Sequence, residues 1–223
     1  MTFDTSTIRQ AIASAMSLSH REIPHYYVMR TIDLQQATQW LASTNAQRPV
    51  QQRLLPAALF IRAVAATLTN VPELNAIWSD GLQLVEEINV GFIVSLRGGG
   101  LMVPAITRAD TKSVDEIMKT LNDIIPRARS MRLRSSEFGT ATITMTNLGE
   151  GGADEVFGLI YPPQVAIVGF GGIRQQPVVM GSDVVVHPVV RVTVGGDHRA
   201  TDGLTANKFL SILDERLQHP ETL

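Results

Sequence analysis

The stretch PVVRVTVGGDHRATDGLTANKFLSILDERLQ, residues 188–218, decides the fold class. It opens with a β-branched run that is typical of a strand, and it closes with apolar residues at helical spacing. Between them lies the polar turn VGGDHRATDGL, in which His198 follows a pair of glycines. A strand, a turn and an amphipathic helix in this order indicate a helix packed on a sheet. The apolar helical positions are Ala206, Phe209, Leu210, Leu213 and Leu217.

Strand and helix patterns interleave along the rest of the chain. QVAIVGF, residues 164–170, is a near-continuous apolar run, as expected for a strand covered on both faces. Residues 54–68 have the pattern of a buried helix. A further helix is expected from about Ser113, and Pro126 is expected to kink or end it. This interleaving predicts an α/β or α+β protein with one mixed sheet. Because no linker or repeat divides the chain, we expect a single domain over residues 1–223.

Composition excludes several classes of protein. The chain has 223 residues, 44% of them apolar and 18% charged, which is enough for a sizeable core. The formal net charge is -2, so nucleic acid is not an expected partner. The one basic cluster, residues 127–134, is interpreted as a solvated helix end. The most apolar stretch is interrupted by Arg62 and is shorter than the roughly 20 residues of a membrane span.

Cysteine is absent from the sequence. A disulfide framework, a thiolate metal site and a cysteine nucleophile are therefore excluded. The N-terminus MTFDTSTIRQ also lacks the apolar core of a secretory leader. Both features are expected of a cytoplasmic protein.

Five histidines are the main candidates for chemistry. His20 and His219 stand among polar residues near helix ends and are expected at the surface. His25 precedes a strand and is expected to be buried and hydrogen-bonded, and His187 is expected in a turn. None of them is spaced with Asp or Glu like a pair of metal ligands, so we expect no metal site.

His198 admits two interpretations. Two glycines before it permit unusual dihedral angles and a close backbone approach, which suits a histidine held at a strand end for catalysis. Alternatively, His198 merely turns the chain while Asp202 caps the final helix. The pattern HxxxDG is too weak by itself to decide between a general base and a turn.

Longer segments resemble a known family. GDHRATDGLTANKFLSILDERLQHPE, residues 196–221, is similar to the C-terminal signature of the acyltransferase component of 2-oxo acid dehydrogenase complexes, a DHRxxDG followed by an amphipathic helix. Matching segments run through the whole chain in the family's order. They are STIRQAIASAM (6–16), IPHYYVMRTIDL (23–34), VPELNAIW (71–78), NVGFIVSLRGGGLMVPAITRADTKSVDEI (89–117), TITMTNLG (142–149) and YPPQVAIVGFGGI (161–173).

This resemblance implies the fold of chloramphenicol acetyltransferase, a mixed sheet with packed helices, assembled as a homotrimer with active sites between subunits. It implies the transfer of an acyl group between a dihydrolipoyl thiol and coenzyme A. Coenzyme A is then a substrate, and a separate domain or protein carries the lipoyl group. The implied partners are a lipoyl-bearing protein and the 2-oxo acid dehydrogenase components, with no nucleic acid and no membrane.

The resemblance also assigns roles to four residues. His198 matches the family's general base, which is needed because a thiol of pKa about 8.5 is mostly protonated at neutral pH. Thr146 matches the hydroxyl that stabilises the tetrahedral oxyanion, with a strand threonine as the plainer interpretation. Asp202 matches the second motif residue, and we expect it to cap the helix and to pair with Arg9. The alternative for Arg9 is an exposed helix arginine.

The sequence departs from the family's pattern at several points. GEGGADEVFGLIY, residues 149–161, replaces the usual segment near the expected acyl site, so we expect an altered acyl preference. Gly195 and Gly196 stand where relatives carry side chains, which predicts a changed substrate channel. The lipoyl and partner-binding domains are missing, and Met1 just before the first helix favours a free-standing variant over a fragment. The short end QHPETL predicts a trimer without a larger shell.

Two other functions remain open. A non-catalytic trimeric scaffold that kept the fold would explain the altered segment and the missing domains. A transferase acting on a small amine or alcohol, as the chloramphenicol enzyme does, is disfavoured because Asp197 stands where that enzyme's signature has a second histidine.

Overall fold

A mixed sheet is the centre of the molecule. The computed structural model describes residues 5–96, 99–149 and 152–223. Among these residues, seven strands join in the order β1-β11-β9-β8-β4-β7, with β10 paired to β11 outside this path. β8 runs parallel to β4 and to β9, while the other neighbours are antiparallel, so the predicted mixed sheet is confirmed. The strands of this sheet are β1 (His25–Asp33), β4 (Val90–Phe92), β7 (Ala105–Ile106), β8 (Ile143–Asn147), β9 (Ala166–Phe170), β10 (Arg174–Met180) and β11 (Asp183–Asp197).

Two small ribbons complete the strands. β2 (Ala76–Trp78) pairs with β3 (Leu82–Leu84), and β5 (Val94–Ser95) pairs with β6 (Leu101–Met102). The first ribbon brings Trp78 close to the end of β11, which matters for the site described below.

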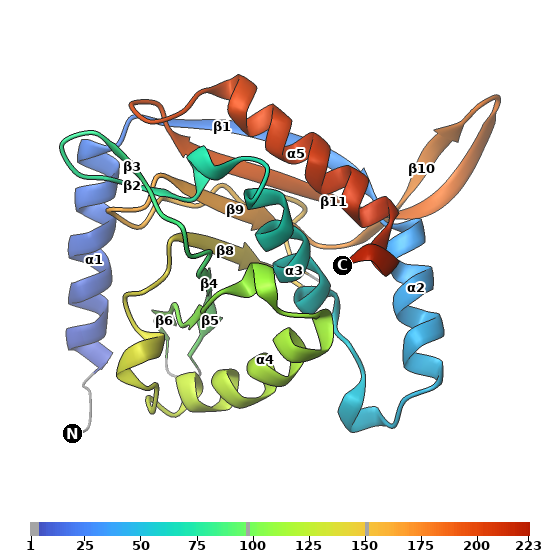
Figure 1. Cartoon of the computed structure of the whole chain (residues 1–223), viewed down its shortest axis with the longest axis horizontal. Coiled ribbons are helices and arrows are strands. Elements are labelled where there is room, and N and C mark those ends of the chain that lie inside the picture. Colours follow the sequence, from blue (N-terminus) through green and yellow to red (C-terminus); the bar gives the residue numbers. More distant parts are fainter. Residues whose placement is uncertain (1–4, 97–98, 150–151) are drawn as a thin grey trace.

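Helices pack on one face of the sheet (Figure 1). α5 lies across β1 and β11, and α3 packs against both α5 and α4. α1 stands beside the sheet and leads directly into β1. Pro126 does not end α4, which continues to Arg129, so the predicted end at this residue is wrong. A proline inside a helix removes one backbone hydrogen bond, and the predicted kink stays a prediction. The helices are α1 (Thr5–Glu22), α2 (Gln35–Ala46), α3 (Pro56–Leu68), α4 (Val114–Arg129) and α5 (Gly203–Gln218).

The core lies between the helices and the sheet. Alternate residues of β1 and β11 point toward the helices, as the period of two requires, and Ile32 pairs with Val190 there. Phe60 of α3 stacks on Phe170 of β9 with ring centroids 4.5 Å apart. Phe170 is fully buried, so the apolar run 164–170 is the covered strand that the sequence predicts.

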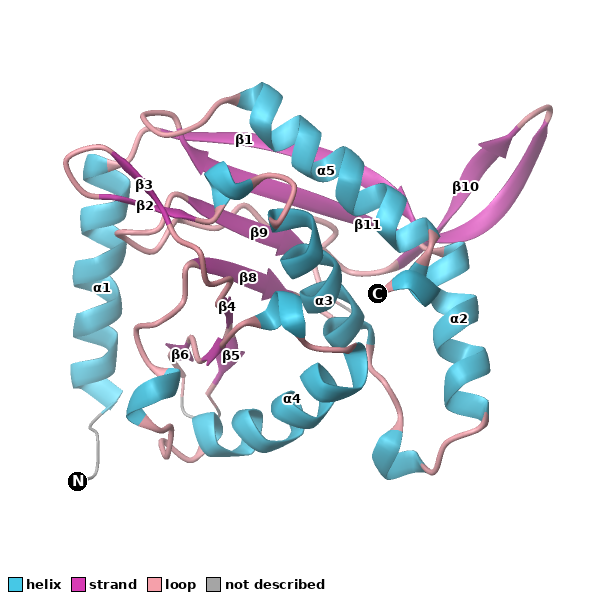
Figure 2. Ribbon diagram, in the orientation of Figure 1, coloured by secondary structure: helices cyan, strands magenta, loops and turns pink. Residues whose placement is uncertain are grey.

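A long hairpin extends beyond the sheet (Figure 2). It consists of β10 and the first half of β11, which begins at Asp183 and not at the predicted Pro188. His187 is therefore a strand residue and not a turn residue, and its Nδ1 lies 2.6 Å from Asp33 Oδ2. Large apolar side chains are exposed along this hairpin: Val179, Met180, Val184 and Val186.

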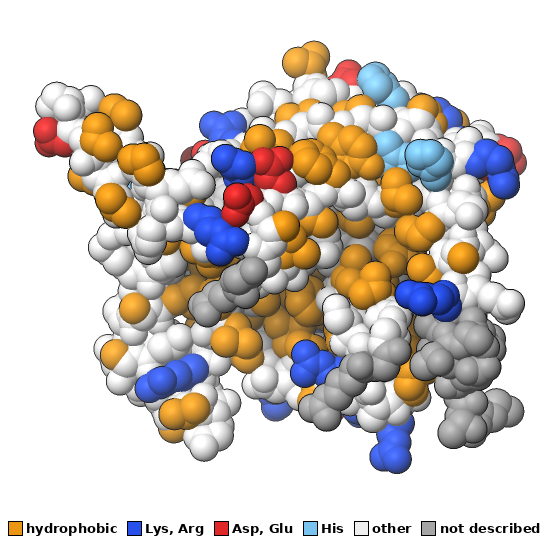
Figure 3. All heavy atoms as spheres, turned by 180° about the vertical axis from the view of Figure 1, so that it is seen from behind, with side chains coloured by type: hydrophobic (Ala, Val, Ile, Leu, Met, Phe, Trp, Pro, Cys, Tyr) orange, Lys and Arg blue, Asp and Glu red, His pale blue; other side chains and the backbone are white. Residues whose placement is uncertain are grey.

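The face of the sheet opposite the helices is only partly covered. Tyr27 and Met29 of β1 point to this face and are 38% and 42% exposed. The segment 152–161 runs over part of it, with Val156 O accepting a bond from Thr193 Oγ1 at 2.5 Å. Seen from behind, hydrophobic side chains line a hollow in the middle of the molecule (Figure 3). Within the described ranges, no helix has the length and apolar character that a membrane crossing requires.

Candidate functional site

A fixed turn presents His198 at the end of β11. The His198 backbone N–H donates to Pro24 O at 3.0 Å, which ties the turn to the start of β1. The N–H groups of Ala200 and Thr201 both donate to Asp197 O at 2.9 Å. The His198 side chain is exposed. A backbone-bonded turn thus holds a solvent-accessible imidazole, which is what a general base for a large substrate needs.

Asp202 caps α5. Its Oδ1 accepts bonds from the backbone N–H groups of Leu204 at 2.9 Å and Thr205 at 3.0 Å. The bond from the Thr205 backbone is the main reason that the pKa of Asp202 lies below its ordinary value. The predicted capping role is therefore seen in the structure.

The ion pair that stabilises this turn was not predicted. Asp197, which is 0% exposed, receives Arg199 as a fork, with Nε 3.0 Å from Oδ1 and Nη2 2.7 Å from Oδ2. The guanidinium also lies over the Trp78 ring, 4.9 Å from its centroid. Asp197 and Arg199 stand on either side of His198, so the sequence contained a signal for their pairing. It contained none for the contact with Trp78, which lies about 120 residues away in the chain.

Arg9, the expected partner of Asp202, does not pair with it within this chain. Arg9 is exposed on α1 and makes no ion pair among the described residues. Glu22 at the end of α1 follows Arg9 by thirteen positions, about 20 Å at 1.5 Å per residue. Since the turn is bonded to Pro24, Arg9 lies far from Asp202 within one chain, and their pairing between two copies stays a prediction.

Thr146 also lies away from His198. It is 8% exposed on β8 and is level with Gly169 of β9 and Thr193 of β11. Two strand spacings of about 4.8 Å and five residues of about 3.3 Å put it about 19 Å from His198. Its side chain points to the face opposite the helices. One chain therefore does not assemble the predicted pair of His198 and Thr146.

His25 is hydrogen-bonded, as predicted, but it is half-buried and not buried. Its Nε2 accepts from the Ile160 backbone N–H at 3.1 Å, and its Nδ1 lies 2.9 Å from Ile23 O. An acceptor at Nε2 leaves Nδ1 as the nitrogen that can donate to Ile23 O. His25 thus ties segment 152–161 to the beginning of β1. His20 and His219 are exposed, as expected.

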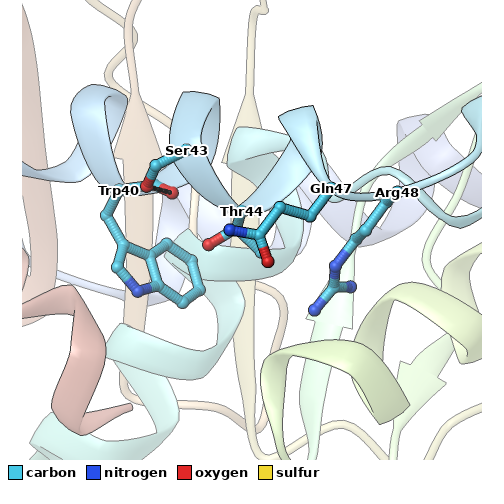
Figure 4. Close-up of a pocket in the computed structure, with 5 residues that line it drawn as sticks. All are labelled: Trp40, Ser43, Thr44, Gln47 and Arg48. Atoms are coloured by element: carbon cyan, nitrogen blue, oxygen red, sulfur yellow. Dashed lines mark hydrogen bonds between the residues drawn. The ribbon is translucent and has the colours of Figure 1, made fainter.

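A cavity beside α2 has few groups that could take part in catalysis. A cavity of about 370 Å³ is lined by α2 and the residues after it, namely Trp40, Ser43, Thr44, Gln47 and Arg48 (Figure 4). Its one cation, Arg48, is already paired with Asp115 of α4. No group of three or more His, Asp or Glu side chains could hold a metal ion in the part of the chain that the structure describes.

The sequence of the chain matches a known protein family over nearly its whole length. Residues 2–223 match the family model described as "2-oxoacid dehydrogenases acyltransferase (catalytic domain)". The chain belongs to this family.

Known relatives agree with this assignment. The chain is 32% identical over 97% of its length to the dihydrolipoyllysine-residue acetyltransferase component of the pyruvate dehydrogenase complex of Staphylococcus epidermidis, of which it spans 51%. The chain thus spans about half the length of the curated relatives that it matches. A crystal structure of a probable dihydrolipoamide acetyltransferase from Listeria monocytogenes superposes with a TM-score of 0.90 at 30% identity, over 99% of this chain and 94% of that one. A chloramphenicol acetyltransferase shares the fold, with a TM-score of 0.58 at 13% identity over 93% of both chains.

In this acyltransferase-family chain, tyrosine rings of the neighbouring strand face the two unusual glycines. Gly196 is paired with Tyr26, and a Cβ built on Gly196 would overlap the Tyr26 ring. Gly195 is paired with Tyr27, whose Cε1 would lie 2.8 Å from a built Cβ. Rings of the neighbouring strand already fill both spaces. The prediction of a changed substrate channel stays a prediction, and any change at these two positions includes the rings of Tyr26 and Tyr27.

The altered segment of this acyltransferase-family chain packs against the sheet. Tyr27 donates its hydroxyl to Gly158 O at 3.1 Å, and its ring meets Phe157 edge-on with centroids 5.5 Å apart. A Cβ on Gly158 would lie 2.6 Å from Ile167 Cδ1, so the segment follows β9 closely. Residues 150 and 151 of this segment lie outside the described residues.

Proposed function

We propose that residues 1–223 are one catalytic domain that transfers an acyl group between a dihydrolipoyl thiol and coenzyme A. The carrying observation is the exposed His198 imidazole on a backbone-bonded turn, within a chain that matches the acyltransferase family over residues 2–223. The similar protein of Staphylococcus epidermidis is named an acetyltransferase, which supports a thioester substrate.

The chemistry needs a base and a hydrogen-bond donor. His198 accepts the proton of the attacking thiol, and the thiolate sulfur adds to the thioester carbonyl carbon. The carbonyl electrons move onto oxygen, giving a tetrahedral oxyanion that Thr146 Oγ1 stabilises by donating a hydrogen bond. Collapse of this intermediate breaks the original carbon–sulfur bond, and the departing thiolate recovers the proton from His198. No bond between acyl group and protein is needed.

We propose that the site is completed between copies in a homotrimer. His198 and Thr146 lie about 19 Å apart in one chain, so a neighbouring copy has to supply one of them. Apolar surface for such assembly is present on the exposed hairpin, where Val184 is 69% and Val186 67% exposed. Arg9 would then stand near the turn of another copy. A lipoyl-bearing protein and 2-oxo acid dehydrogenase components are the proposed partners.

The test is an acyl-transfer assay. Acetyl-, succinyl- and branched acyl-coenzyme A are each offered with dihydrolipoamide to the wild type, to His198→Ala and to His219→Ala. We expect His198→Ala to lose at least about 100-fold in kcat, because general-base catalysis contributes about 10²–10⁴-fold. His219 is an exposed histidine at the other end of α5, so its variant controls for loss of an imidazole. Equal rates in wild type and His198→Ala would remove His198 from the mechanism.

A trimeric scaffold is the alternative function. It is favoured by one observation, the altered segment 149–161 near the expected acyl site. No turnover with any acyl donor in a wild type whose light-scattering mass equals three chains of 24.3 kDa would support it. A mass of many hundreds of kilodaltons would contradict the proposed trimer.

A further inference from the structure

Tyr26 contacts both the imidazole and the far end of the His198 turn. Its ring meets the His198 ring edge-on, with centroids 5.1 Å apart and planes at 61°. Its hydroxyl lies 2.9 Å from Thr201 Oγ1, and Thr201 is itself bonded through its backbone to Asp197. One side chain of β1 therefore bridges the turn that follows β11.

Gly196 is what allows this contact. A Cβ built on Gly196 would overlap Tyr26 Cε1 and Cζ and would lie 2.5 Å from the phenolic oxygen. Any other residue at this position would displace the Tyr26 ring from the turn. Glycine inside a strand weakens the strand unless another group needs the space, and here the ring of the paired residue takes that space.

The surroundings keep the phenol neutral. Burial is the largest effect and raises the pKa of Tyr26; the bond to Thr201 lowers it by less, and the nearby carboxylates of Asp202 and Asp197 add small further increases. A neutral phenol retains its proton for the hydrogen bond with Thr201. The ring edge also occupies one side of the imidazole, which limits the rotamers that His198 can adopt.

We propose that Tyr26 is a positioning residue for His198. It touches no reacting atom; it fixes the direction in which the imidazole accepts the thiol proton. The inference rests on the proposed function, in which His198 is the base. It adds a requirement that the family match does not state: the pair Tyr26–Gly196 acts as one unit, because the glycine has no function without the ring.

The kinetic test uses three variants at Tyr26 and Gly196. Tyr26→Leu removes the ring edge and should lower kcat about 10- to 100-fold with KM within about twofold, as expected for a misdirected catalytic group. Tyr26→Phe keeps the ring and should retain kcat within about threefold. Gly196→Ala should lower kcat like Tyr26→Leu, because it displaces the ring. Val28→Ala, two residues along the same face of β1, controls for lost packing.

Combining the variants separates positioning from general damage. Leucine lacks the Cε1, Cζ and hydroxyl atoms that a Cβ at position 196 would meet. Gly196→Ala should therefore lower kcat by less than about twofold when added to Tyr26→Leu, although it is harmful alone. Full additivity of the two losses would overturn the proposal. A raised KM with unchanged kcat in Tyr26→Leu would also overturn it, by assigning Tyr26 to substrate binding.

An activity-independent measurement keeps the inference separate from the proposed function. In the ¹³C-histidine-labelled protein, the His198 Cε1–H signal should be displaced by the Tyr26 ring current in the wild type and in Tyr26→Phe. The displacement should disappear in Tyr26→Leu and in Gly196→Ala. An unchanged signal in both would overturn the positioning role even in an active enzyme. A wild type without acyl transfer, but with this displacement, would refute the proposed function and leave the contact established.

Discussion

Replacing Arg199 by methionine is expected to destabilise the chain by about 3 kcal/mol. The Asp197 carboxylate is 0% exposed, and the Arg199 guanidinium donates three hydrogen bonds to it, at 3.0, 3.2 and 2.7 Å. After the substitution, the backbone N–H of Arg199 is the bond that remains to Oδ1, at 3.0 Å. Breaking a buried pair by removing one partner costs about 3–5 kcal/mol. We take the lower end because the Arg199 side chain is 33% exposed and partly solvated.

Urea unfolding at pH 7 measures this cost. All variants are compared at one protein concentration, because assembly shifts the apparent stability. Asp197→Asn combined with Arg199→Met removes both charges, and it should lose less than Arg199→Met alone, since no unpaired carboxylate stays buried. Arg21→Met is the matched control: its partner Glu22 and Arg21 are 54% and 68% exposed, and we expect a change below about 0.5 kcal/mol.

Two results would contradict the stabilising role of the Asp197–Arg199 ion pair. If Arg199→Met lies within about 0.5 kcal/mol of the wild type, the Asp197 carboxylate does not depend on this guanidinium, and the turn is held by its backbone bonds alone. If the double variant is less stable than Arg199→Met, the ion pair is not the source of the loss. Either result would remove the pair from the account of how His198 is held.

Three further outcomes are expected. The hydrogen bond from Arg127 lowers the pKa of Glu137. The stability that the ionised Glu137 contributes is therefore complete above about pH 4.3 and is lost as the pH falls through the lowered pKa. Glu137→Gln should flatten the dependence of the unfolding free energy on pH between about pH 5 and 3, and parallel urea profiles of the two proteins would contradict this. His25→Phe leaves the Ile160 N–H without its acceptor and should lower the unfolding free energy by about 1–3 kcal/mol, and an unchanged urea midpoint would count against the bond. Val186→Asp on the exposed hairpin should reduce the light-scattering mass toward one chain of 24.3 kDa, and an unchanged mass would exclude this hairpin from the assembly.

Local patterns were sufficient to predict much of the fold. Apolar spacing predicted α5, and the position of Asp202 just before it predicted the cap, because both depend on neighbours within a few residues. The hairpin was missed because β10 is an edge strand whose sequence, RQQPVVM, contains Pro177 and polar residues. Its pairing with β11 is what moved the beginning of that strand from Pro188 to Asp183.

The candidate site could be predicted only where its contacts are local. His198 and Asp202 share one turn, and the sequence placed them together. Arg199 meets Trp78, and Tyr26 meets Thr201, through pairings of distant segments that no local pattern contains. These long-range contacts arise from sheet register and from the position of a two-stranded ribbon, which are fixed by the whole fold and not by nearby residues.

The surroundings of Gly195 and Gly196 depend on contacts across the sheet. Seen along the chain, Gly195 and Gly196 are missing side chains, and a missing side chain suggests open space. Seen across the sheet, they face Tyr27 and Tyr26 in register, one ring on each face. Because a Cβ at either position would meet a ring, the side chains of β1 fill the space beside the end of β11 in this chain. The two glycines therefore have to be interpreted together with β1, because Tyr26 makes a contact with the imidazole that position 196 alone would never suggest.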